Sequence, residues 1–303
     1  MFTGLSAFPL TPLRRDGRGG EAVDDDAFVR LVDRLTAARV DSITALGSTG
    51  SAAYLSGAER AHVARLAVEH AGDTPVIVGI GALRTKHVIA NAEAAEQAGA
   101  AGLLLAPLTY QALTDDDVVG LYQDVTAATS LPVIVYDNPA TTHVAFTVET
   151  YARIARLPGI ASIKIPGVPD DAAVARAHID AIRTVVPDHV SIGVSGDARA
   201  VAGLAAGCDA WYSVIGGTLP GLARRMTDAA VDGRPGEAAE ESARLAPLWD
   251  LFAACGGSIR VVAAIAEHLG LVPAHCLPLP IRGLTTEQRT AVARVVEELD
   301  LAE

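Results

Sequence analysis

With 303 residues, half of them hydrophobic, the chain is long enough for one large α/β domain or two ordinary domains around a sizeable core. Its net charge of −12 argues against a nucleic-acid partner, because binding to phosphates needs clustered Lys and Arg. Three cysteines without a CxxC pair, and the lack of an apolar stretch of membrane-spanning length, predict a soluble cytoplasmic protein with no membrane partner.

Short apolar runs alternate with segments of helical spacing as far as residue 214. We expect eight strands, at residues 4–7, 42–46, 76–79, 102–106, 133–136, 160–164, 190–194 and 210–214. The segments between them, such as residues 58–71 and 85–98, carry Ala, Leu and Val at spacings of three and four residues. The acidic runs at residues 24–26 and 115–117 are interpreted as helix caps rather than metal ligands. Eight strands with helical crossovers predict a closed (β/α)8 TIM barrel.

After residue 221 the strand signal fades. Residues 222–231, 235–255, 258–269 and 285–299 are predicted to be helices, separated by short Gly- and Pro-containing segments. We therefore expect a catalytic barrel at residues 1–221 and an all-helical C-terminal extension at residues 222–303, packed on the barrel.

Only two lysines, Lys86 and Lys164, occur among the 24 Lys and Arg residues. A guanidinium stays protonated and cannot act as a nucleophile, so a lysine kept in an apolar strand suggests a need for its amine. Burial of Lys164 at the end of such a strand would favour the neutral amine, which can form a Schiff base with a carbonyl substrate. Alternatively, the Lys164 stem packs at the strand end while its ammonium reaches water. Lys86 begins a predicted helix and is interpreted as solvated surface.

Polar groups follow two more of the predicted strands, at the barrel edge where catalytic groups gather. The run Gly47-Ser48-Thr49-Gly50 offers backbone amides and hydroxyls to a carboxylate or phosphate, although an ordinary glycine-rich turn has the same composition. Tyr136 ends the fifth strand and is either a proton shuttle or a rim tyrosine with a satisfied hydroxyl. The order of these groups and Lys164 on strands two, five and six is more informative than any one of them.

Three motifs resemble the family of dihydrodipicolinate synthase and N-acetylneuraminate lyase: Gly47-Ser48-Thr49-Gly50, Tyr136-Asp137-Asn138-Pro139 and Ser162-Ile163-Lys164. The resemblance covers essentially the whole chain. It implies a class I, Schiff-base aldolase or lyase that acts on pyruvate or another 2-oxo acid, and on an aldehyde, without a metal or cofactor. It also implies a homotetramer. The eight histidines form no HxH or HExxH pattern, which disfavours a metal-dependent class II aldolase.

The resemblance implies a role for each matching residue. Lys164 is then the Schiff-base residue, Tyr136 the general acid/base, and Ser48 a carboxylate ligand that relays protons to the tyrosine. The implied substrate-binding residues are Gly47, Thr49, Gly50 and Tyr212, with Thr141 and Tyr110 as further candidates around the distal part of the substrate.

Departures from the family pattern bear on the substrate. The synthases usually carry an arginine two residues after the proline of the tyrosine motif, where it clamps a second carboxylate, and this chain has Thr141. A hydroxyl is a much weaker partner than a bidentate arginine. Ser51 stands where the family's glycine-rich turn usually ends in glutamate. Ile165 stands directly after Lys164, where the synthases usually have an acidic residue. Tyr110 matches the family's relay tyrosine only with one inserted residue. Dihydrodipicolinate synthase activity itself is therefore less expected.

Two other functions remain open. A non-catalytic or regulatory relative would bind a 2-oxo acid without turning it over. A metal- or phosphate-dependent barrel enzyme would share only the fold. Thr142 and His143 are further candidates for shaping the pocket, with His143 either a second acid/base or an exposed loop residue.

Overall fold

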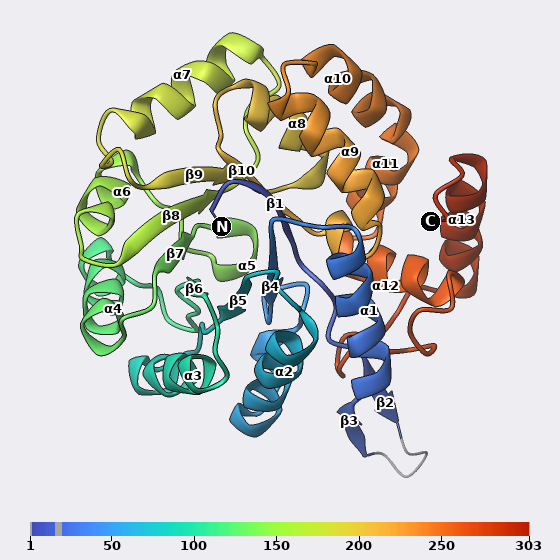
Figure 1. Cartoon of the computed structure of the whole chain (residues 1–303), viewed down its shortest axis with the longest axis horizontal. Helices are drawn as coiled ribbons and strands as arrows, with labels where there is room; N and C mark the ends of the chain where they lie inside the picture. The colour runs from blue at the N-terminus through green and yellow to red at the C-terminus, as the bar shows by residue number, and fades with distance from the viewer. Residues whose placement is uncertain (1, 16–19, 303) are drawn as a thin grey trace.

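A closed barrel of eight parallel strands forms the centre of the computed structural model, which describes residues 2–15 and 20–302 (Figure 1). The strands are β1 (Gly4–Ala7), β4 (Ser42–Ala45), β5 (Val76–Gly79), β6 (Gly102–Leu105), β7 (Val133–Tyr136), β8 (Ile160–Ile165), β9 (Ser191–Val194) and β10 (Ala210–Ser213). Neighbours follow chain order, and β1 closes the barrel by pairing with both β4 and β10. The predicted TIM barrel is confirmed, with every strand within one residue of its expected bounds.

Helices cover the outside of the barrel (Figure 1). They are α1 (Asp25–Ala37), α2 (Gly57–His70), α3 (Thr85–Gln97), α4 (Asp115–Ala128), α6 (Val148–Ala155), α7 (Ala172–Arg183), α8 (Ala200–Ala205) and α9 (Pro220–Val231). The Asp24 side chain accepts a hydrogen bond from the Ala27 amide at the start of α1, and Thr114 and Asp117 form a capping box at the start of α4. The interpretation of the acidic runs as caps is confirmed at both helices.

Several short elements were not predicted. An antiparallel hairpin, β2 (Leu13–Arg15) and β3 (Glu21–Val23), lies between β1 and α1, and its three-residue strands are too short to show alternation. Short helices follow the strand ends: η1 (Ala52–Tyr54), α5 (Pro139–Thr142), η2 (Asp197–Arg199) and η3 (Ile215–Gly217). The prediction of a single helix at residues 235–255 was wrong. The segment is two helices, α10 (Pro235–Arg244) and α11 (Ala246–Ala254), because Pro247 has no N–H and cannot lie inside a continuous helix.

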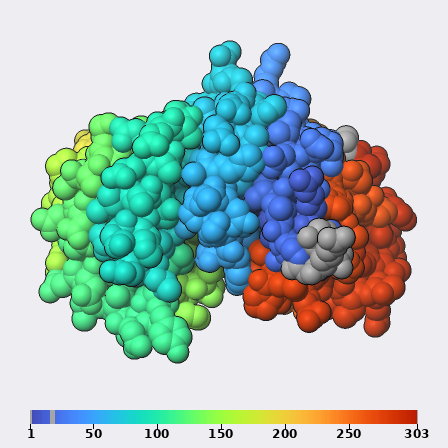
Figure 2. Space-filling view, turned by 90° about the horizontal axis from the view of Figure 1, so that it is seen from below, coloured from blue at the N-terminus to red at the C-terminus, as the bar shows by residue number. Residues whose placement is uncertain are grey.

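The C-terminal helices α10, α11, α12 (Ser258–His268) and α13 (Thr286–Glu298) lie beside the barrel, and Figure 2 shows this segment next to the N-terminal one. One hydrophobic cluster includes Val261 and Val292 as well as Leu31 of α1. Helix α9 contacts β1. The domain division after residue 221 stays a prediction, and its outer limits, Met1 and Glu303, lie outside the described residues. Within the described ranges, no helix is long and apolar enough to cross a membrane.

Alternate residues of the barrel strands face the barrel interior. On β7, Val133 and Val135 belong to the large outer core, whereas Ile134 and Tyr136 belong to a smaller cluster that also contains Phe8. This is the period of two that a strand imposes on its side chains. The site therefore begins on the inward-facing positions.

Gly193 of β9 is required by the close packing inside the barrel. A Cβ atom there would lie 2.2 Å from Cε2 of Tyr212. We expect Gly193→Ala to lower the free energy of unfolding by about 1–3 kcal/mol, measured by urea denaturation. Gly120→Ala is the control, because a Cβ at this helical position meets nothing within 4 Å, and it should stabilise by about 0.5–1 kcal/mol. Equal stability of the Gly193 variant and the parent would contradict the tight contact.

Candidate active site

The strand register brings Lys164 and Tyr136 together. Lys164 on β8 pairs with Tyr136 on β7, so the two residues lie at the same level of the barrel and their side chains are neighbours on the same face of the sheet. The Lys164 Nζ lies 3.8 Å from the centroid of the Tyr136 ring and 4.1 Å from that of Phe8. Lys164 is 2% exposed. The alternative in which its ammonium reaches water is therefore wrong for this structure.

Burial changes the protonation of Lys164. Loss of hydration disfavours the ammonium form and holds the pKa of Lys164 below its ordinary value of 10.5. Tyr136 and Asp197 act in the opposite direction on this pKa, but burial is the larger cause. A larger fraction of the Lys164 amine is thus neutral than in a solvent-exposed lysine at the same pH, and only the neutral form is a nucleophile.

Asp197 is a buried acid whose charge acts on Lys164. Its carboxylate accepts hydrogen bonds from Trp211 Nε1 at 3.0 Å, the Ser213 hydroxyl at 3.2 Å, and the amides of Val214 and Ile215 at 3.1 and 2.8 Å. Burial raises the pKa of Asp197, while these hydrogen bonds act to lower it. Asp197 was not among the predicted site residues, because chain order does not reveal that it is buried and acts on the lysine.

The Tyr136 hydroxyl is held between two polar side chains. It lies 3.4 Å from Ser48 Oγ, and Asn138 Nδ2 donates a hydrogen bond to it at 2.8 Å. Asn138 Nδ2 also donates to Thr141 Oγ1 at 2.8 Å. Because Asn138 donates, the tyrosine's own proton is left for Ser48 or a bound molecule. Asn138 was not among the predicted site residues, and its position two residues after Tyr136 is the sequence feature that corresponds to this contact.

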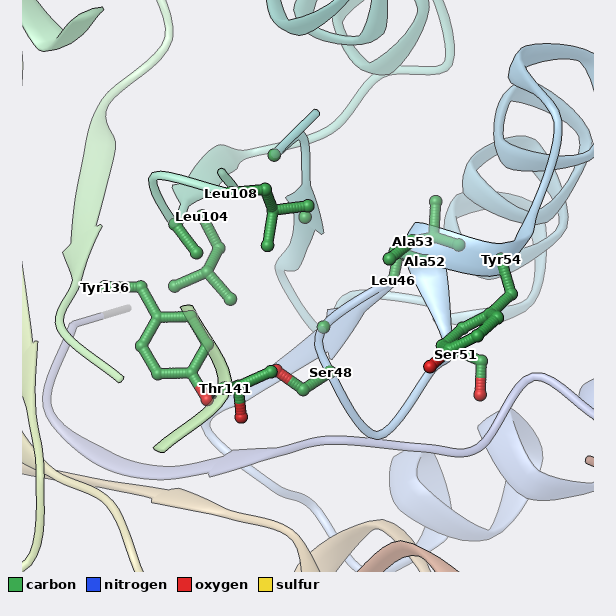
Figure 3. A pocket seen from close by; sticks show the side chains of 14 residues that line it. Leu46, Ser48, Ser51, Ala52, Ala53, Tyr54, Leu104, Leu108, Tyr136 and Thr141 are labelled. Atoms are coloured by element: carbon green, nitrogen blue, oxygen red, sulfur yellow. Dashed lines mark hydrogen bonds between the residues drawn. The ribbon is translucent and has the colours of Figure 1, made fainter. Parts of the chain in front are cut away.

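Tyr136 and Ser48 line a cavity of about 220 Å³, hereafter the inner cavity (Figure 3). Its other lining residues are Leu46, Gly47, Ser51, Ala52, Ala53, Tyr54, Gly79, Gly81, Leu104, Ala106, Leu108 and Thr141. An outer cavity of about 680 Å³ shares Ala53, Gly81, Leu108 and Thr141 with it. A ligand in the inner cavity therefore has the Tyr136 hydroxyl on one side and mainly apolar groups on the other.

Comparison with known proteins places this arrangement in a family. The family model described as the Dihydrodipicolinate synthetase family matches residues 1–299. The chain belongs to this family. It is a lyase of the class I aldolase type that this family comprises.

Individual relatives agree with this assignment. The 4-hydroxy-tetrahydrodipicolinate synthase of Nitrosomonas europaea is 31% identical over 98% of each chain. A crystal structure of dihydrodipicolinate synthase from Agrobacterium tumefaciens is 41% identical, with a TM-score of 0.92 and 98% of each chain covered. A chloride-inhibited dihydrodipicolinate synthase from Acinetobacter baumannii, in a complex with pyruvate, is 25% identical with a TM-score of 0.88, and the match covers 99% of this chain and 100% of that one.

Of the glycine-framed turn expected from the family motif, Gly47 and Ser48 line the inner cavity, whereas Thr49 and Gly50 do not. A Cβ at Gly47 would lie 2.7 Å from Cδ1 of Phe8, and one at Gly50 would lie 3.0 Å from the Leu46 amide nitrogen. Both positions therefore need the close approach that glycine allows. Thr49 is buried within this turn.

Other expected residues lie in different surroundings. Tyr212 is buried inside the barrel, is hydrogen-bonded to Ser162 Oγ at 2.7 Å, and lines neither cavity. Tyr110 is 89% exposed and also lines neither cavity, so this chain by itself does not bring it to Tyr136. Their roles in substrate binding stay predictions. Lys86 and His143 are exposed, as the surface interpretation of each expected. Within the ranges that the structure describes, no three His, Cys, Asp or Glu side chains gather as a metal site.

Proposed function

We propose that the chain is a Schiff-base-forming aldolase or lyase that acts on pyruvate or another 2-oxo acid. The observation that carries this proposal is the buried amine of Lys164 against the Tyr136 ring, whose hydroxyl opens into the inner cavity. Membership of the family supports it, as does the pyruvate bound to the Acinetobacter baumannii relative.

The first half of the reaction forms an imine. The neutral Lys164 amine attacks the C2 carbonyl, and Tyr136 transfers a proton from nitrogen to the carbonyl oxygen. The resulting hydroxyl then takes the proton of Tyr136 and leaves as water, so that a protonated imine joins the nitrogen to C2 and Tyr136 is left as a phenolate. The substrate carboxylate would be held by the Ser48 and Thr49 hydroxyls and the amides of the glycine-framed turn.

The second half makes or breaks a bond at C3. The protonated imine withdraws electrons, so C3 can lose a proton to the Tyr136 phenolate and become the nucleophilic carbon of an enamine without a metal ion. Attack of C3 on an aldehyde carbon forms the C–C bond, and the aldehyde oxygen takes a proton from Tyr136. Water then hydrolyses the imine and releases Lys164. Cleavage follows the same steps in reverse.

Thr141 stands where the synthases usually have a carboxylate-clamping arginine, which argues against the activity named for the relatives. Thr141 does line both cavities, so the residue at this position faces the substrate space. We also propose a cytoplasmic location, from the three cysteines without a CxxC pair, and a homotetramer, from the family resemblance.

The test is borohydride reduction in the presence of pyruvate, read by peptide mass spectrometry. We expect a reduced pyruvyl adduct on the peptide that contains Lys164. Exchange of pyruvate C3 protons with deuterium should rise with pH through the lowered pKa of Lys164 and level off below pH 10.5, because the neutral amine is already abundant there. An adduct without C3 exchange would favour the non-catalytic alternative. Folded protein that gives no adduct with any 2-oxo acid would refute the proposal.

A further inference from the structure

Most of the wall of the inner cavity away from Tyr136 is apolar. Figure 3 shows Leu104 and Leu108 on one side of the cavity and Ala52 and Ala53 on the other, where the hydroxyl-bearing side chains of Ser51 and Tyr54 also lie. Ser48 and Thr141 lie together next to Tyr136, whose ring contacts the Lys164 amine, and Lys164 itself is not among the lining residues. The part of a substrate beyond C4 therefore faces mainly aliphatic side chains.

No charged side chain is among the described residues that line the inner cavity. Arg60 lies behind its wall and lines the outer cavity. Its two terminal nitrogens donate to the carbonyl oxygens of Gly79 and Gly81, each at 2.9 Å, and the residue is 6% exposed. Burial lowers the pKa of Arg60 to about 10, so it remains a cation at neutral pH, but its terminal donors are directed at the backbone. Beyond the hydroxyls and amides proposed to hold the carboxylate of the 2-oxo acid, a second carboxylate in the inner cavity would have no cation among the described lining residues to pair with.

The inner cavity has room for a ring or a branched chain. A dry apolar cavity of about 150 Å³ binds benzene. The inner cavity measures about 220 Å³, and part of it must hold the atoms of the 2-oxo acid. This leaves space in the inner cavity for one compact group, and an extended chain would have to continue into the outer cavity.

We propose that the carbonyl partner of this enzyme is an uncharged aldehyde with a compact apolar substituent, either aromatic or branched aliphatic. The inference rests on the proposed function, because it assumes that C3 of the Lys164 enamine attacks the aldehyde carbon. The new C–C bond leaves a hydroxyl at C4 of the released 4-hydroxy-2-oxo acid. The apolar substituent on C4 then packs against Leu104 and Leu108.

The matched substrates for the test are benzaldehyde and isobutyraldehyde, the hydroxylated glyceraldehyde, and succinic semialdehyde, which carries a carboxylate. Each is supplied with pyruvate to the full chain, and kcat/KM for the aldehyde is measured from product formation. We expect benzaldehyde or isobutyraldehyde to exceed succinic semialdehyde by about 100-fold or more, because an unpaired buried carboxylate is strongly disfavoured. The kcat/KM for glyceraldehyde should lie between that of the apolar aldehydes and that of succinic semialdehyde.

A substitution of the wall tests the cause of this selectivity. Leu108→Arg places a guanidinium beside the inner cavity. It should raise kcat/KM for succinic semialdehyde, relative to kcat/KM for the apolar aldehydes, by about 10-fold or more. Val231→Arg adds the same charge at an exposed position at the end of α9 and should leave the ratio unchanged. If the Leu108 variant does not fold, the selectivity of the unmodified chain decides the question.

Borohydride trapping with pyruvate, run in parallel, separates two kinds of failure. If pyruvate is trapped on Lys164 but succinic semialdehyde or glyceraldehyde reacts as well as the apolar aldehydes, the inference is overturned and the proposed function stands. Trapping with no consumption of any aldehyde also overturns the inference. If pyruvate and the other 2-oxo acids fail to be trapped, the proposed function fails and the inference fails with it.

Discussion

Replacing Lys164 by alanine or arginine is expected to abolish imine trapping and to reduce aldol turnover by about 10⁴-fold or more, the scale on which loss of a catalytic nucleophile acts. Alanine has no amine. Arginine keeps a long cationic side chain, but its guanidinium stays protonated and cannot form the imine. Trapping is followed by mass spectrometry and turnover by product formation. Circular dichroism should show the folded chain in both variants.

The matched control is Lys86→Ala. Lys86 is the other lysine of the chain, and it is exposed in the first turn of α3. This variant removes a primary amine without touching either cavity, so trapping and turnover should equal those of the parent. Full activity of either Lys164 variant, or loss of trapping in the Lys86 variant, would contradict the assignment of Lys164.

The barrel was predictable because its signal is repeated and local. Each strand is a short apolar run bounded by turn residues, and most of the intervening segments show helical spacing. Such patterns depend on neighbours in sequence, so the bounds of the eight strands followed within one residue. The segment at residues 235–255 shows where such local patterns fail. Its composition favours helix throughout, so the pattern did not predict the break between α10 and α11 just before Pro247.

The candidate site was predictable in its order but not in its contacts. The positions of Ser48, Tyr136 and Lys164 at strand ends are consequences of topology, which chain order reveals. The contact of Asn138 with the Tyr136 hydroxyl depends on the orientation of a side chain just before the short helix α5, and hydrophobic periodicity does not predict that orientation. Likewise, the exposure of Tyr110 follows from the path of the loop after β6.

Replacing Tyr136 by phenylalanine is expected to lower kcat by about 10²–10⁴-fold, the usual contribution of a positioned acid or base, with a much smaller effect on KM. Phenylalanine keeps the ring beside the Lys164 amine and removes the hydroxyl that contacts Ser48 and Asn138. Tyr136 acts to raise the pKa of Lys164, so losing this interaction lowers that pKa further and leaves more neutral amine. Slower turnover would then reflect lost proton transfer rather than a protonated lysine.

Tyr122→Phe separates this effect from the general loss of a buried hydroxyl. The Tyr122 hydroxyl donates to the Leu105 carbonyl at 2.6 Å and accepts from the Tyr136 backbone amide at 3.4 Å, but it lies outside both cavities and does not touch the Tyr136 hydroxyl. This variant should lose about 1 kcal/mol of stability and keep kcat within a few-fold of the parent. A Tyr136→Phe enzyme that turns over as fast as the Tyr122→Phe control would show that another group moves the protons. Ser48 also contacts the Tyr136 hydroxyl, at 3.4 Å, so Ser48→Ala would then be the next variant to measure.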